Sequence, residues 1–225
     1  MMSEQTATEI SNVKTEISRD LSGSTGRFAE LVAAGTPTPG GGSVAAYCGV
    51  LAAALGRMMC NLTIGKKKYE QAEPAVREIR EELARTGVRL SELIDEDAAS
   101  FERVMAAYRM PKESADEQAA RDAAIEAAAT DSIAVPHETA RCALELLRLL
   151  ARLSKLGNPN AFPDLTTGSQ LALVAVKGAS YNIGVNLPML KDRDAAARWR
   201  REIDGIADES AALARQIEGE MLARM

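Results

Sequence analysis

The stretch SVAAYCGVLAAALGRMMCNLTI, residues 43–64, decides the fold of this chain. Its apolar residues fall on every side of a helical projection, and small residues recur along it, among them Ala45, Gly49 and Gly56. A helix that is apolar all round is buried by its neighbours, and small side chains let neighbouring backbones approach closely. The sequence therefore predicts a central buried helix over residues 43–64.

Two long helical patterns follow this central helix. Apolar residues keep helical spacing over residues 76–110, and Pro111 ends the pattern. A second pattern spans residues 114–156, and Pro136 within it must kink or split the helix. The reason is that proline lacks a backbone N–H and clashes with the preceding turn.

The last third of the chain predicts two more helices. An apolar helix over residues 164–187 follows a Gly-Asn-Pro-Asn turn, with Asp164 as its N-cap. Pro188 interrupts it, and Asp192 caps a final amphipathic helix. Since no stretch alternates as a strand would, the predicted fold class is all-α.

Residues 25–225 are predicted to form a single domain, an up-and-down bundle of long helices. Its first helix is short, beginning near Thr25 and stopping at Gly35. Residues 1–24 are an N-terminal extension that is either an amphipathic helix or a frayed tail. The surplus apolar surface of such long helices suggests that the bundle continues into a partner subunit.

Composition excludes several classes of protein. Aromatic residues make up 4% of the 225 residues, so the core must consist of aliphatic side chains and Met. A net charge of −5 argues against a nucleic-acid partner. Three cysteines without paired spacing fit a reducing compartment, and a single histidine excludes His-rich metal sites.

The sequence also argues against a membrane partner. Residues 1–24 are polar, unlike an export signal. The longest uncharged run, residues 31–56, is broken by prolines and glycines, and the remainder is too short for the ~20 residues of a membrane span. A cytoplasmic location is therefore expected.

The most unusual segment is the loop TPTPGGGS, residues 36–43. Two prolines stiffen it, three glycines remove side chains, and Ser43 can cap the helix that follows. Such a loop exposes backbone N–H groups that suit a carboxylate, a carbonyl or a phosphate. It lacks the Gly-Lys-Ser/Thr ending of a P-loop, and it could equally be a tight connection between helices.

Three further clusters each have a functional and a structural interpretation. Lys66-Lys67-Lys68 beside Tyr69 is either a cradle for a polyanionic tail or a solvated face. Asp97 shares a helix face with apolar neighbours, with Asp95 on its flank. A carboxylate facing the core there could act as a base or stabilise a cation. The alternative is an acidic surface turn.

Asparagines form the last cluster. Asn182 and Asn186 are four residues apart on one helix face, so they could orient a heterocycle or bridge two helices. Asn158 and Asn160, with Asp164, could bind a ligand or only make the turn and cap the helix. His137, after the predicted kink, is expected to be structural or exposed rather than catalytic.

Several of these segments occur together and in order, over residues 26–195. They are TPTPGGGS (36–43), MCNLTIGKKKY (59–69), LIDED (93–97) with Phe101, AYRMPK (107–112), GNPN (157–160) with Asp164, and NIGVNL (182–187) with Asp192. In this combination the chain resembles the formiminotransferase-cyclodeaminase C-terminal family, and its CNLTIGKKKY wording is most similar to the stand-alone methenyltetrahydrofolate cyclohydrolases. One departure is Pro163, which stands where the family usually has serine.

The resemblance implies an all-helical homodimer that binds tetrahydrofolate derivatives in a cleft near the subunit interface, without metal or cofactor. It implies hydrolysis of 5,10-methenyltetrahydrofolate to 10-formyltetrahydrofolate. One alternative is the formiminotetrahydrofolate cyclodeaminase reaction, which releases ammonia. Another is a folate-binding or interaction scaffold without activity.

The methenyl bridge is a cation that water must attack, so the reaction needs a base and a proton donor. The expected catalytic residues are Asp95, Asp97, Lys68 and Asp164. The expected substrate-binding residues are Thr38, Pro39, Gly40, Gly41, Gly42, Ser43, Lys66, Lys67, Tyr69, Asn158, Asn182 and Asn186. Among them, Lys66 and Lys67 are assigned to the glutamate tail.

Overall fold

The computed structural model describes residues 25–225, and within this range all regular secondary structure is helical. The predicted all-α fold class is thereby confirmed. The chain divides into two compact units, one before Gly40 and one from Gly40 to Met225. Of the first unit, residues 25–33 are helical as expected, and Gly35 follows with a positive φ of 74°. The interpretation of residues 1–24 lies outside the described residues, and the predicted domain boundary at residue 24 stays a prediction.

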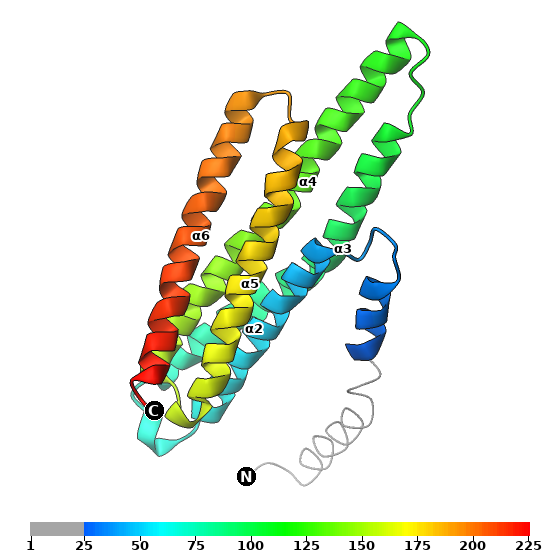
Figure 1. Cartoon of the computed structure of the whole chain (residues 1–225). Helices are drawn as coiled ribbons and strands as arrows, with labels where there is room; N and C mark the ends of the chain where they lie inside the picture. Colours follow the sequence, from blue (N-terminus) through cyan, green and yellow to red (C-terminus); the bar gives the residue numbers. More distant parts are fainter. Residues whose placement is uncertain (1–24) are drawn as a thin grey trace. The chain divides into compact units, whose positions relative to one another are not determined.

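The second unit is an antiparallel bundle of long helices (Figure 1). Its helices are α2 (Gly41–Thr63), α3 (Glu73–Tyr108), α4 (Ala115–Leu156), α5 (Phe162–Asn186) and α6 (Arg193–Leu222), with the short 3-10 helices η1 (Lys67–Tyr69), η2 (Pro159–Ala161) and η3 (Leu187–Met189) between them. Helix α2 packs chiefly against α3 and α5, and α4 packs against α3, α5 and α6. The predicted burial of this helix on every side is therefore only partly confirmed, because Leu51, Met58 and Leu62 on one side of α2 are exposed.

Small residues bring the helices around α2 close together. A Cβ on Gly49 would lie 2.9 Å from a Leu90 methyl on α3. On the α5 side, a Cβ on Gly178 would lie 2.8 Å from Cβ of Ala45. Because a methyl group does not fit at such distances, these glycines set the spacing of α2 from both neighbours. Toward the C-terminus of α2, its contacts move toward the N-terminus of α3 and of α5. Helix α2 is therefore antiparallel to both.

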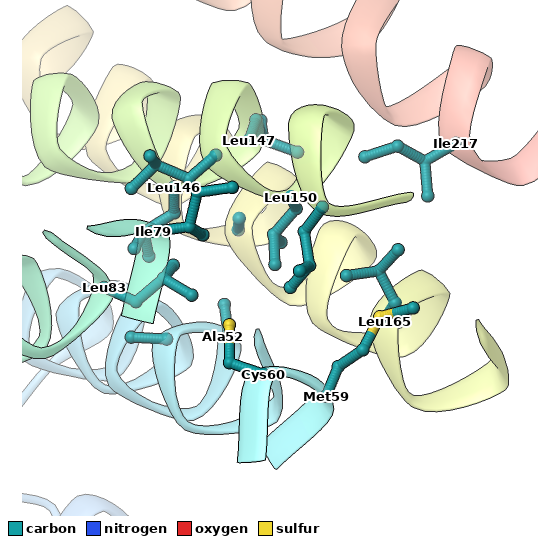
Figure 2. Close-up of a cluster of buried hydrophobic side chains, with 14 of the residues drawn as sticks. Ala52, Met59, Cys60, Ile79, Leu83, Leu146, Leu147, Leu150, Leu165 and Ile217 are labelled. Carbon is teal, nitrogen blue, oxygen red and sulfur yellow. The ribbon is translucent and has the colours of Figure 1, made fainter. Parts of the chain in front are cut away.

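The core is aliphatic, as the low aromatic content predicts. Figure 2 shows leucines and isoleucines of α3, α4, α5 and α6 meeting the sulfur-containing side chains of α2. Met59 and Cys60 of α2 are completely buried among them. By length and composition alone α2 could also cross a membrane, but half of that apolar window is buried inside the bundle. The core helix of a soluble protein has the same composition.

Two predicted N-caps are wrong, and of the two outcomes predicted for Pro136, a kink or a split, the split is wrong. Helix α2 begins at Gly41 with Gly40 as its N-cap, so Ser43 lies inside the first turn and does not cap it. Helix α5 begins at Phe162 because Pro163 suits a first turn, which places Asp164 inside the helix rather than at its N-cap. Helix α4 continues through Pro136 without splitting.

The break at Pro136 is avoided through a contact from another helix. Pro136 cannot donate a hydrogen bond to the carbonyl of Ser132, one turn earlier. Asn186 at the end of α5 does so instead, its Nδ2 lying 2.9 Å from Ser132 O. The other capping predictions hold: Asp192 accepts hydrogen bonds from the backbone N–H groups of Asp194 and Ala195 at the start of α6.

Candidate active site

Asp97 on α3 lies against the first turn of α2. The hydroxyl of Ser43 is 2.9 Å from Asp97 Oδ2 and 3.1 Å from the backbone oxygen of Ile94. Ser43 itself has no exposed surface, whereas Asp97 is half-buried. The prediction that Asp97 faces the core is therefore confirmed. Ser43, predicted to bind substrate, lies behind Asp97 instead, where no substrate can touch it.

Gly42 makes this contact possible. A Cβ at position 42 would overlap the Asp97 carboxyl group, with Oδ2 only 2.7 Å away. Glycine in the loop is thus required by the approach of a carboxylate from another helix. The N-cap residue of α2, Gly40, has no side chain that could accept hydrogen bonds from the first turn. The Asp97 carboxylate of α3 takes the place of such a capping side chain.

Burial raises the pKa of Asp97 above its ordinary value. Hydrogen bonds from the Ser43 hydroxyl and the Ser43 backbone N–H act in the opposite direction and are the smaller effects. A carboxyl group with a raised pKa can accept a proton and return it more readily near neutral pH than an exposed aspartate can. The arrangement therefore suits general acid–base chemistry.

Asn182 lies beside this carboxylate site. Its Nδ2 donates to the backbone oxygen of Gly178, and the same atom is 3.9 Å from the position of a Cβ on Gly41. Within residues 25–225 no hydrogen bond engages its Oδ1. An amide oxygen held in place beside an α2 N-terminus can accept a hydrogen bond from a ligand. Asn186, one turn further along α5, donates to Ser132 of α4 as described above, which is the helix-bridging alternative; its assignment to substrate stays a prediction.

Asp95 does not join Asp97. It is exposed on the outer side of α3, as its flanking position suggested. Its neighbour Glu96 is held by Arg89 through a two-pronged ion pair. The acidic run thus combines one inward carboxyl group with two on the surface, and only Asp97 contacts α2.

The other predicted residues lie at the opposite end of α2. Lys66, Lys67 and Lys68 are exposed around η1, and the Lys68 ammonium lies 5.5 Å from the Tyr69 ring centroid. A surface hollow of about 440 Å³ is lined by Gly65, Lys66, Lys67, Glu70 and Glu73. Asp164 in the first turn of α5 is at the same end and makes no hydrogen bond or ion pair within the described residues.

Asn158 at this end is structural. It is buried, its Nδ2 donates to the backbone oxygen of Leu62, and its Oδ1 accepts from the Asn160 N–H. The Tyr69 hydroxyl donates weakly to the same Oδ1 at 3.4 Å. These bonds tie η1, α2 and η2 together. The structure therefore favours the turn-forming interpretation of Asn158 over substrate binding.

The family model described as Formiminotransferase-cyclodeaminase matches residues 24–205 of this chain. The chain belongs to this family. It is 36% identical, over 84% of its length and 91% of the relative, to a methenyltetrahydrofolate cyclohydrolase of Methylorubrum extorquens. It is 28% identical to the formimidoyltransferase-cyclodeaminase of Rattus norvegicus, over 88% of this chain and 36% of the relative.

The fold has a solved counterpart in the same family. The crystal structure of formiminotetrahydrofolate cyclodeaminase from Thermotoga maritima superposes with a TM-score of 0.77 at 28% sequence identity. The match covers 87% of this chain and 94% of the other. The bundle is therefore the family's fold over nearly its whole length.

In a single chain of this family member, the predicted site residues lie in two groups at opposite ends of α2. Helix α2 has 23 residues, so its ends are separated by about 34 Å. Asp97, Ser43 and Asn182 lie at one end, and Lys68 and Asp164 at the other. Thr38 and Pro39 belong to the unit before Gly40. The sequence already indicated this separation, because the predicted helix over residues 43–64 lies between the glycine loop and the lysines. The two motifs are close in sequence, but the helix between them keeps them apart.

Within residues 40–225, an apolar face that no helix of the bundle covers connects the two ends. On α2 it includes Leu51, Met58 and Leu62, each 37–41% exposed, and on α5 it includes Val174, Tyr181 and Val185, 50–72% exposed. Since both helices turn their other sides toward α3, α4 and α6, these side chains share one face. We call it the α2–α5 face. Large contiguous exposed apolar patches are typical of interaction sites.

Metal ligands are not grouped in the described part of the chain: no three His, Cys, Asp or Glu side chains there could hold an ion together. The expected independence from metal and cofactor stays a prediction. His137, on α4, packs edge-on against Trp199 with ring centroids 4.8 Å apart, and its Nε2 is 3.3 Å from a Glu202 carboxylate oxygen. It has the structural position that was expected.

Proposed function

We propose that this protein is a methenyltetrahydrofolate cyclohydrolase that converts 5,10-methenyltetrahydrofolate and water to 10-formyltetrahydrofolate. The observation that carries the proposal is Asp97, a half-buried carboxyl group with a raised pKa beside Asn182 and the N-terminus of α2. The similarity to the Methylorubrum cyclohydrolase, which extends over 91% of that relative, supports the choice of reaction.

In the proposed reaction Asp97 is the general base and then the general acid. As water attacks the methenyl carbon, a C–O bond forms and one water proton passes to Asp97. The bond from this carbon to N5 then breaks, and N5 takes the proton back from Asp97. The remaining hydroxyl proton leaves to solvent as the formyl carbonyl forms. Asn182 accepts a hydrogen bond from the pterin in this scheme, and the ionised Asp97 attracts the cationic substrate before attack.

The two ends of α2 come together if the protein is a homodimer. We propose that two copies pair through the α2–α5 face about a two-fold axis that lies in the plane of this face and is perpendicular to the helices. The helices of the copies then run antiparallel, so the Lys66–Lys68 end of one copy lies over the Asp97 end of the other. Lys68 of one subunit would donate a hydrogen bond to the substrate, and Lys66 and Lys67 would meet the substrate's glutamate tail, in a site completed by the second subunit.

Mixed dimers test this composite site. Asp97→Asn and Lys68→Met are purified separately, each with low activity, and then mixed in equal amounts under conditions that exchange subunits. A mixed dimer has one site with both substitutions and one with neither. About a quarter of the wild-type activity should return, because half of the dimers are mixed and each has one intact site of two. Absence of recovery, with exchange verified by mass labels, would place both residues in a site within one chain.

The activity itself is tested with purified protein and 5,10-methenyltetrahydrofolate at neutral pH. Loss of the methenyl chromophore is followed against the spontaneous hydrolysis blank, with and without a chelator. We expect acceleration well above the blank that the chelator does not change. Asp97→Asn, purified identically, controls for a contaminating hydrolase.

The cyclodeaminase reaction is the second candidate, favoured by the structural likeness to the Thermotoga enzyme. It predicts ammonia release from formiminotetrahydrofolate and no acceleration of methenyl hydrolysis. Folate binding without turnover of either substrate would leave a non-catalytic scaffold. We propose a cytoplasmic protein whose partners are folate and a second copy of itself, without nucleic acid or membrane.

A further inference from the structure

The Ser43 hydroxyl has one hydrogen to donate but lies near two acceptor oxygens. Its single hydrogen faces both Asp97 Oδ2 at 2.9 Å and the Ile94 backbone oxygen at 3.1 Å. A serine hydroxyl donates one hydrogen bond but can accept two. It therefore cannot donate to both oxygens at once, and the protonation state of Asp97 decides which one receives the hydrogen.

Each protonation state of Asp97 has a complete hydrogen-bond arrangement. When Asp97 is ionised, Ser43 donates to the carboxylate, a charge-assisted bond that is stronger than one to a neutral carbonyl. When Oδ2 carries a proton, that proton is donated to Ser43 Oγ, and the Ser43 hydrogen turns to Ile94. The carboxyl group thus keeps its contact with Ser43 before and after a proton transfer.

Within residues 25–225, no neighbouring charge is among the causes that shift the pKa of Asp97. The facing segment of α2, Gly41 to Val44, is uncharged, and α5 presents the neutral amide of Asn182. On α3 itself, Asp95 is exposed and Glu96 is paired with Arg89. Burial and the Ser43 groups are the causes that shift the pKa of Asp97. Ser43 is therefore the residue whose hydrogen bonds lower the pKa of this carboxyl group, against the larger effect of burial.

We propose that Ser43 is a positioning residue that holds the Asp97 carboxyl group in one orientation in both protonation states. The inference rests on the proposed function in so far as it assigns Asp97 two successive proton transfers. Ser43 reaches the substrate only through Asp97, because its own side chain is fully buried.

The test compares Ser43→Ala with Ser169→Ala. Ser169 on α5 is equally buried, but its hydroxyl donates only to Thr166 O in its own helix. The titration of Asp97 is followed by the carboxyl ¹³C shift of labelled aspartate, assigned by its disappearance in Asp97→Asn. Ser43→Ala removes a hydrogen-bond donor to the ionised Asp97 carboxylate, so the pKa of Asp97 should rise. The expected rise is about one unit, as for the loss of a hydrogen bond to a charged group. Ser169→Ala should leave the pKa of Asp97 unchanged.

The pH profile of kcat is the second measurement. In Ser43→Ala the acid limb should move to higher pH by the same amount, because the base must be ionised to accept the proton from water. Ser43→Thr keeps the hydroxyl and should restore the wild-type midpoint even where the added methyl lowers stability. An unchanged ¹³C midpoint in folded Ser43→Ala would overturn the proposal.

The two measurements separate this inference from the proposed reaction. If wild-type protein hydrolyses neither folate yet the ¹³C midpoint rises in Ser43→Ala, the proposed function fails and the coupling of Ser43 to Asp97 stands. If hydrolysis is fast but the acid limb of Ser43→Ala coincides with that of Ser169→Ala, the function stands and the positioning role fails.

Discussion

The two ends of α2 place aspartates in opposite relationships to a helix. Asp97 approaches the N-terminus of α2 from another helix and is held there by the Ser43 hydroxyl. Asp164 lies in the first turn of its own helix, α5, where a negative charge stabilises the helix dipole. The comparison shows that the role of a carboxyl group depends on whether it contacts the N-terminus of another helix or lies in the first turn of its own helix. A carboxyl group fixed by a second helix can be desolvated and oriented, whereas one at its own helix start mainly stabilises that helix.

The largest expected effect is the loss of kcat on replacing Asp97, the carboxyl group that is held by a second helix. Asp97→Asn should lower kcat by about 10²–10⁴-fold at neutral pH, because an amide cannot accept the proton from water. The matched change at the other end, Asp164→Asn, should lower kcat by less than about tenfold. Steady-state kinetics of methenyl hydrolysis measure both. Equal losses would show that the two carboxyl groups share the proton-transfer role.

A second comparison sets Gly42 against Gly65. The Cβ of Gly42→Ala would displace the Asp97 carboxyl group, so kcat should fall by about 10–10²-fold, as for a misplaced catalytic group. Gly65 has open space around it but a φ of 77°. Gly65→Ala should leave kcat near wild type and cost about 1–2 kcal/mol in unfolding free energy, since alanine resists this conformation. Kinetics together with urea unfolding distinguish the two effects, and an unaffected kcat in Gly42→Ala would contradict the steric account.

The two asparagines of α5 give a third, smaller effect. Asn186→Ala leaves the Ser132 carbonyl without a donor and should cost about 1–3 kcal/mol in unfolding free energy. In a Pro136→Ala background, the restored backbone N–H can bond to Ser132, so the same substitution should cost less. Urea unfolding of the four proteins gives the coupling. Additive costs would mean that Asn186 does not compensate for the proline.

The smallest expected effect concerns the lysine end. Lys66→Ala and Lys67→Ala should each raise KM for a polyglutamylated substrate a few-fold, about 0.2–1 kcal/mol, because exposed charge pairs are weak. KM for the monoglutamate should change less. Salt should diminish the difference, since the Debye length falls from about 8 Å at physiological ionic strength to about 3 Å at 1 M. Equal KM changes for both substrates at every salt concentration would remove the lysines from tail binding.

Local patterns predicted the helices well but their boundaries less well, and two of the three exceptions, at α2 and α4, share a cause. Helix α2 begins two residues before the expected Ser43 because an acceptor at its N-terminus comes from Asp97, 54 residues away in sequence. Helix α4 survives Pro136 because Asn186 supplies the missing donor. Spacing along the chain indicates which side chains share a face, but it does not contain the partner on another helix.

The sequence by itself determined that the protein is all-helical and that residues 43–64 form an apolar helix. These properties follow from periodicity and from the aversion of apolar side chains to water, which act over a few turns. Only the tertiary structure decided that Ser43 serves Asp97, that Asn158 and Asn186 form structural contacts, and that the lysines and the Asp97 carboxylate lie at opposite ends of α2, a helix about 34 Å long. Each of these depends on the register in which antiparallel helices pack, and glycine contacts between helices fix that register.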